Sequence, residues 1–236
     1  MRRSLAVLFF LALLAPAPAQ TWSDVGLYRQ LMADQPESTQ ALETILRDPQ
    51  AISAITLFTA AGVAHRAQRV EDAGFLLSIA RLRAAFDEKM FPPTSRGGDS
   101  PLTLLAALSQ QVGDAVSPAL ASDPQLMRRA LNRIKAWQPT APAGYAPGWK
   151  FKKRGAEKSA QATLADERAQ LVRQLDEFCT LLEDPDYFAA FKIGQAYNLS
   201  PDGAGPTKDA YDHAMKTMAR IEKQKGLHGA AAMAQR

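Results

Sequence analysis

The chain has 236 residues, of which 47% are hydrophobic and 22% are charged, and its formal net charge is +4. This length fits one large domain or two small ones, and it is sufficient to bury about 70% of the surface that the unfolded chain exposes. Cys179 is the single cysteine, so an intramolecular disulfide is excluded and stability must come from packing.

Residues 1–19 have the pattern of a secretory signal peptide. Arg2 and Arg3 form a short cationic region, an uncharged apolar run follows from Leu5 to Leu14, and small residues precede a cleavage point after Ala19. The apolar run is too short to cross a membrane, which takes about 20 apolar residues. We therefore expect a periplasmic or secreted protein that is not an integral membrane protein.

Three Asp-Pro pairs mark predicted helix starts. An Asp side chain at the N-cap accepts hydrogen bonds from the free N–H groups of the first turn, and a Pro after it has no N–H to satisfy. Apolar residues at helical spacing follow each pair, and no segment alternates with a period of two. We therefore predict an all-α fold, a compact multi-helix domain of antiparallel helical hairpins with a repeat-like character. The pairs are Asp48-Pro49, Asp123-Pro124 and Asp184-Pro185.

The segment 54–87 predicts a closely packed helical hairpin. Its small and apolar positions are Leu57, Ala60, Ala61, Ala64, Ala73, Leu77 and Ala80. This pattern resembles the apolar skeleton of a single tetratricopeptide repeat, in which small residues let two antiparallel helices approach closely. The resemblance implies a helical scaffold that binds other proteins.

Two insertions, 91–101 and 139–155, interrupt the helical pattern. In the first, Ser100 before Pro101 is interpreted as a helix N-cap. The second places aromatic residues among Pro, Gly and Lys. We divide the chain into the signal peptide (1–19), an N-terminal helical part (20–138), a basic aromatic loop (139–155), a C-terminal helical part of the same domain (156–225) and a tail (226–236).

The C-terminal part predicts a long helix followed by a final one. Leu164, Leu171 and Phe178 lie seven residues apart, which is typical of a helix that packs along a narrow seam. Cys179 shares this apolar surface, so we expect a buried and unreactive thiol. Gly226 is the predicted cap of the last helix.

The charges of the mature chain are unevenly distributed. Residues 124–156 contain eight cations and no acidic residue, so the rest of the mature chain carries −6. In one interpretation, these cations pair with the acidic residues that follow them. In the other, they face outward and attract an anionic partner. The acidic residues are Asp166, Glu167, Asp176, Glu177, Glu183, Asp184 and Asp186.

The second interpretation defines a candidate binding surface. We expect the loop cations to be exposed and Trp149 to be partly buried, because burying Trp is favourable whereas burying an unpaired Lys costs several kcal/mol. The candidate binding residues are Arg128, Arg129, Arg133, Tyr145, Trp149, Lys150, Lys152, Lys153 and Arg154.

Catalytic and metal-binding patterns are scarce. No nucleophile elbow, zinc-protease motif or phosphate-binding loop occurs. Asp209 and His213 share a helix face, but cations lie nearby, and we interpret them as a solvated pair rather than as metal ligands. We predict no metal and no cofactor. The carboxylates that could act as acid and base are Glu71, Asp72, Asp87 and Glu88, which we expect on solvated helix faces.

These observations favour an exported, non-enzymatic helical protein that binds another protein or an anionic component of the cell envelope. Nucleic acid is not an expected partner of an exported chain. The alternative is a cell-wall hydrolase with a carboxylate general acid or base. A deep cleft lined by two carboxylates, one of them buried, would favour the hydrolase, whereas a groove or a flat basic face would favour binding.

Overall fold

The computed structural model describes residues 24–95, 97–141, 143–152, 159–200 and 204–227. Within these ranges the chain is all-α, as predicted, with one isolated β-bridge between Pro93 and Phe151. The predicted signal peptide (1–19), Lys153 and Arg154 lie outside the described residues. The helices are α1 (Val25–Leu31), α2 (Glu37–Arg47), α3 (Ala54–Arg66), α4 (Val70–Met90), α5 (Pro101–Ala121), α6 (Pro124–Ala136), α7 (Ala160–Leu182), α8 (Pro185–Asn198) and α9 (Lys208–Lys225).

Two of the three predicted Asp-Pro helix starts are confirmed. Asp123 begins α6 and Asp184 begins α8, and each side chain accepts backbone N–H hydrogen bonds in the first turn. The prediction for Asp48 is wrong, because α2 ends there and the carboxylate accepts from Gln50 N in a turn. Helix α3 begins five residues later, where the Ser53 hydroxyl caps it.

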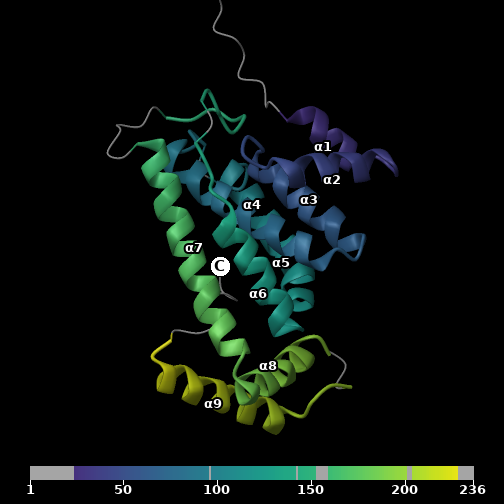
Figure 1. The fold of residues 1–236 in the computed structure, drawn as a ribbon, viewed down its shortest axis with the longest axis vertical. Coiled ribbons are helices and arrows are strands. Elements are labelled where there is room, and N and C mark those ends of the chain that lie inside the picture. The colour runs from purple at the N-terminus through teal and green to yellow at the C-terminus, as the bar shows by residue number, and fades with distance from the viewer. Residues whose placement is uncertain (1–23, 96, 142, 153–158, 201–203, 228–236) are drawn as a thin grey trace, which may run out of the picture.

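Helix α4 lies at the centre of the molecule, between α3, α5, α6 and α7 (Figure 1). Its position agrees with the burial of large apolar side chains along it, among them Phe75, Ile79 and Phe86. Two charged residues of α4, Arg83 and Asp87, are also buried. The burial of these two side chains was not predicted from the sequence.

Helices α3 and α4 form the predicted hairpin. All seven small and apolar positions of the pattern are buried, and Ala60, Ala64 and Ala73 have no measurable exposure. Small side chains at the contact allow the two helix axes to approach closely. The resemblance to a tetratricopeptide repeat stays a prediction.

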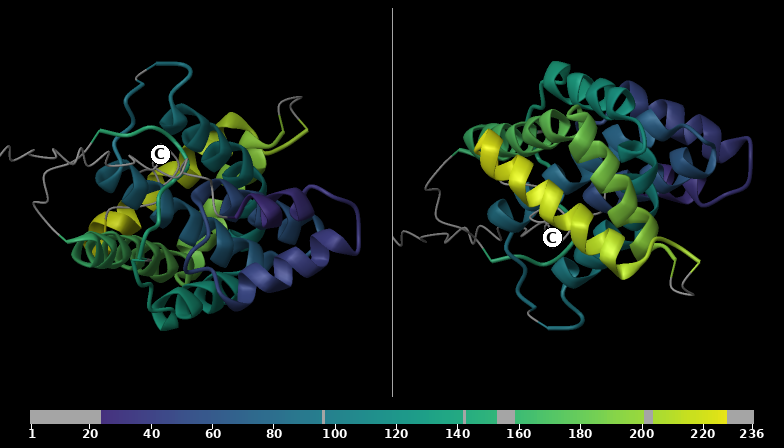
Figure 2. Two further views of the ribbon diagram at one scale, coloured as in Figure 1. Left: turned by 90° about the horizontal axis from the view of Figure 1, so that it is seen from above. Right: turned by 90° about the horizontal axis from the view of Figure 1, so that it is seen from below.

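Helix α7 runs along one side of the molecule, and the α8–α9 hairpin lies across its end, far from α1 and α2 (Figure 1). Figure 2 shows α9 running across this end of the molecule. On α7, Leu164 and Phe178 are buried and Leu171 is half-buried, which agrees with the predicted seam. Gly226 ends α9 in the left-handed conformation with φ of 62°, as predicted. No helix within the described ranges is long and apolar enough to cross a membrane.

A small second core lies at the end of α4. Leu82, Phe86 and Leu164 form its buried centre, and half-buried Phe91 and Tyr145 pack against it. Tyr145 belongs to the loop that the sequence singled out, so this core joins the loop to the helices.

Candidate functional site

Residues 139–141 and 143–152, which we call the strap, are held against the end of α4. Thr94 N donates to Lys150 O at 3.1 Å, and Lys152 N donates to Pro92 O at 2.9 Å. These two bonds flank the bridge between Pro93 and Phe151. The strap is therefore an ordered, packed segment rather than a bare linker.

Aromatic side chains of the strap pack against Phe91 at the end of α4. The Trp149 indole N–H donates to Phe91 O at 2.9 Å. The Phe91 ring meets those of Tyr145 and Phe151 edge to face, at centroid distances of 5.9 and 5.1 Å. Such ring pairs add about 0.5–1.5 kcal/mol each to the burial of their apolar surface. The prediction that Trp149 is partly buried against the helices is confirmed.

Two neutral amide side chains brace the start of the strap. Gln50 donates to Gln138 O at 3.0 Å and accepts from Thr140 N at 2.9 Å. Gln161 on α7 accepts from Ala141 N at 2.9 Å and donates to Pro139 O at 3.1 Å. The strap is thus attached both to the turn before α3 and to the first turn of α7.

The ammonium groups of the strap face solvent. Lys150 and Lys152 are exposed, and neither forms an ion pair with any residue in the described part of the chain. They alternate with the inward-facing Trp149 and Phe151, as expected for an extended segment. This confirms the predicted division for these four residues, while Lys153 and Arg154 fall outside the described ranges.

The cations of α6 are in a different situation. Arg128 binds Asp176 of α7 and Glu183 just after this helix, and Lys135 also binds Asp176 at 3.0 Å. These bonds raise the pKa of Arg128 and lower the pKa of Asp176. In this part of α6 the cations therefore pair with the acidic residues that follow them, which is the first of the two sequence interpretations.

Arg129 and Arg133 also have partners, but on α4. Arg129 binds Glu71 at 3.0 Å, and Arg133 binds Asp72 and lies over the Phe75 ring. Sequence reasoning missed these partners, because they precede the cations by about 60 residues. The three arginines expected at the binding surface are consequently occupied by internal ion pairs.

A cluster of charged groups is buried beneath the strap. Tyr145 O–H donates to Asp87 Oδ2 at 2.8 Å, and the Arg83 guanidinium lies 4.7 Å from the centroid of the Tyr145 ring. Arg83 also donates to Gln50 O. Asp24, at the start of α1, is 4% exposed and accepts from Ser53 N at 2.8 Å.

Burial raises the pKa of the Asp87 carboxyl to about 7, and the nearby Asp24 charge adds to the rise. The Tyr145 hydrogen bond and the Arg83 charge act in the opposite direction but do not cancel it. The expectation that Asp87 lies on a solvated helix face is wrong, because this side chain has no exposure at all. Its neighbour Glu88 is exposed, as expected.

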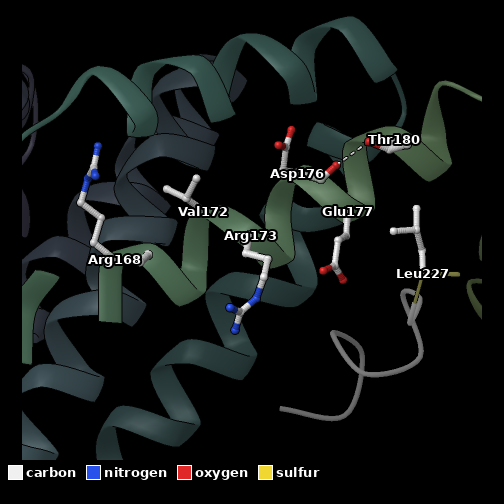
Figure 3. Close-up of a pocket in the computed structure, with 8 residues that line it drawn as sticks. Arg168, Val172, Arg173, Asp176, Glu177, Thr180 and Leu227 are labelled. Atoms are coloured by element: carbon white, nitrogen blue, oxygen red, sulfur yellow. Dashed lines mark hydrogen bonds between the residues drawn. The ribbon is translucent and has the colours of Figure 1, made fainter. Parts of the chain in front are cut away.

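A hollow of about 590 Å³ opens beside α7 on another side of the molecule (Figure 3). Figure 3 shows the side chains of Asp176 and Glu177 pointing away from each other, so they do not form an acid–base pair. Arg128 and Lys135 already bind the Asp176 carboxylate. The hollow is lined by Arg168, Ala169, Val172, Arg173, Asp176, Glu177, Thr180 and Leu227.

The other candidate groups show no assembled chemistry. Asp209 and His213 are exposed on α9. Within the described ranges, no three His, Cys, Asp or Glu side chains are grouped to hold a metal ion. Cys179 is fully buried, and burial raises its thiol pKa to about 11. Its predicted burial is confirmed.

Comparisons with protein families, with curated proteins and with solved structures found no match.

Proposed function

We propose that this chain is an exported helical protein that binds an anionic partner, a component of the cell envelope or an acidic protein, through the cations of the strap. The observation that carries the proposal is the contrast between two groups of cations. Arg128, Arg129 and Arg133 each form an ion pair within the chain, although Arg129 is exposed, whereas Lys150 and Lys152 are exposed and form no ion pair within the described structure.

The attachment of the strap supports the same proposal. Trp149 and Phe151 are packed, and the backbone between them is hydrogen-bonded to residues 92–94. A lysine on such a segment loses less conformational freedom on binding than one on a free loop, so more of its interaction energy contributes to affinity. Exposed cations without internal partners also attract anions at long range, in a manner that salt screens.

The alternative of a cell-wall hydrolase has less support. A carboxyl with a pKa near 7 suits a general acid, but the Asp87 carboxyl is fully buried and out of reach of a polymer in this conformation. The hollow beside α7 offers Asp176, whose pKa is lowered by its cations, and this is the wrong direction for an acid.

The test uses vesicles of phosphatidylglycerol, with vesicles of phosphatidylcholine for comparison. We expect salt-sensitive binding to the anionic vesicles only. The double variant Lys150→Gln/Lys152→Gln should bind about tenfold or more weakly, since each lysine near an anionic surface contributes about 1 kcal/mol.

The matched control is Lys216→Gln/Lys223→Gln. These lysines are exposed on α9, form no ion pair within the described structure, and give the same change in net charge. Equal weakening by both double variants would show a general charge effect rather than a site on the strap. Purified lipopolysaccharide, assayed with the same three proteins, distinguishes a lipid headgroup from a phosphorylated saccharide.

A further inference from the structure

The cluster under the strap has an excess of negative charge. Asp24 and Asp87 carry two carboxylates, and Arg83 supplies one positive charge, all within side chains that are at most 4% exposed. An uncompensated charge in a protein interior costs several kcal/mol, and uptake of one proton by a carboxyl removes it. The cluster is therefore neutral when one carboxyl is protonated.

Asp87 is the carboxyl in direct contact with the strap. Its Oδ2 accepts from Tyr145 O–H, and its Oδ1 has no hydrogen-bond partner within the described structure. Two Arg83 nitrogens, Nε and Nη1, likewise have none. Tyr145 thus covers a cluster whose polar groups are only partly satisfied, and removing this cover would give them access to water.

The groups that face Asp87 come from three elements: Arg83 on α4 itself, Tyr145 on the strap, and Asp24 at the start of α1. Two charged side chains of α7, Glu167 and Arg168, have partners outside this cluster. Glu167 binds Lys89, and Arg168 donates to backbone carbonyl oxygens at the end of α6.

We propose that Asp87 makes the strap sensitive to pH: its carboxyl holds a proton while the strap is closed on the end of α4, and loss of that proton releases the strap. This pH-dependent release does not depend on whether Lys150 and Lys152 bind a partner.

The direction follows from proton linkage. In the closed state the pKa of Asp87 is about 7, and in an open, hydrated state it returns toward the ordinary value near 4. The closed state therefore binds the proton more tightly, and protonation stabilises it. As the pH rises from about 4 to about 7, the equilibrium shifts toward the open state by up to tenfold per pH unit. Above pH 7 both states are ionised, and the shift levels off.

Hydrogen exchange of the full chain tests this proposal. The amides of Thr94 and Lys152 report on closure directly, because their hydrogen bonds join the strap to residues 92–94. After correction for intrinsic exchange rates, we expect their protection to fall at least tenfold between pH 5 and pH 7.5. Amides in the middle of α8 should change much less, since α8 does not contact the strap.

Asp87→Asn keeps the shape of the side chain and removes its titration. In this variant the protection of both amides should become independent of pH over the same range. Should it fail to fold, Tyr145→Phe gives a second test. It removes a hydrogen bond that lowers the pKa of Asp87 in the closed state, so the loss of protection should continue to a higher pH before it levels off.

Asp72→Asn is the matched control, because Asp72 is bound to Arg69 and Arg133 and lies away from the strap. It should leave the pH dependence of the strap amides unchanged. Constant protection of the wild-type amides from pH 5 to pH 7.5 would overturn the proposal. So would an unchanged loss of protection in Asp87→Asn.

Discussion

Among single residues, Trp149 contributes most directly to the attachment of the strap. Its ring packs against the main core, and its indole N–H is bonded to Phe91 O. Trp149→Ala removes both, and we expect a loss of about 2 kcal/mol in the free energy of unfolding, below the range for fully buried Trp. Trp149→Phe should lose about 1 kcal/mol, because most of the ring contact remains. Denaturant titration measures both, and an Ala variant as stable as wild type would contradict this role.

Cys179 provides a test of interior packing. Because its thiol is fully buried and its pKa is raised to about 11, the reactive thiolate is scarce at neutral pH. We expect a thiol reagent to modify the native protein very slowly and the denatured protein within minutes. Mass spectrometry with and without denaturant measures the difference. Rapid modification of the native chain would show that this part of α7 opens readily.

The residues of the strap also show what local chemistry can and cannot predict. The burial of Trp149 and the exposure of Lys150 were predictable, because the free energy of burial is favourable for an indole ring and unfavourable for an unpaired ammonium group. The burial of Asp87 was not, because its cause lies in Tyr145, 58 residues further along the chain. A carboxylate on a helix beside Glu88 has the same local sequence whether or not a distant loop covers it.

For the helices, alanine substitutions at two helical glycines are expected to change stability in opposite directions. A Cβ at Gly74 of α4 would lie 2.6 Å from a methyl carbon of Leu120 on α5, whereas a Cβ at Gly194 of α8 meets nothing within 4 Å. Gly74→Ala should destabilise the protein by about 1–3 kcal/mol, since the overlap outweighs the gain in helix propensity. Gly194→Ala should stabilise it by about 0.5–1 kcal/mol.

Thermal unfolding of the two alanine variants measures these effects. Destabilisation by both would mean that α8 packs more tightly than the structure shows. Stabilisation by both would mean that α5 can move away from α4 at little cost.

Helix boundaries were predictable where the cap is local. Asp184 and Pro185 act within one turn, and α8 begins there. Asp48 has the same local pattern, but Ser53 caps α3 and the Asp48 side chain closes a turn instead. In this turn, Gln50 is hydrogen-bonded both to the strap and to Arg83. Tertiary contacts therefore decided between two equally suitable starts.

Over the whole molecule, the uneven charge of the sequence becomes a set of ion pairs across α6. The acidic partners lie on α7, which the sequence order suggested, and on α4, which it did not. Exposed pairs of this kind contribute about 0–1 kcal/mol each, so they orient α6 more than they stabilise it. Because the arginines of α6 are paired in this way, the candidate site is smaller than the basic stretch 124–156. Sequence alone showed the excess of cations but not which of them remain available.

The braces of the strap connect residues that are far apart in the sequence, and this separation has a consequence for folding. Gln50 reaches Gln138 across 88 positions, and Trp149 reaches Phe91 across 58. Contacts between distant residues require closure of long loops, whereas hairpins such as α3–α4 need only a short turn. We therefore expect the strap to dock last, after α4 and α7 have come together. Until it does, the rings of Phe86 and Phe91 remain uncovered, so a chain stalled at this step would be prone to aggregate.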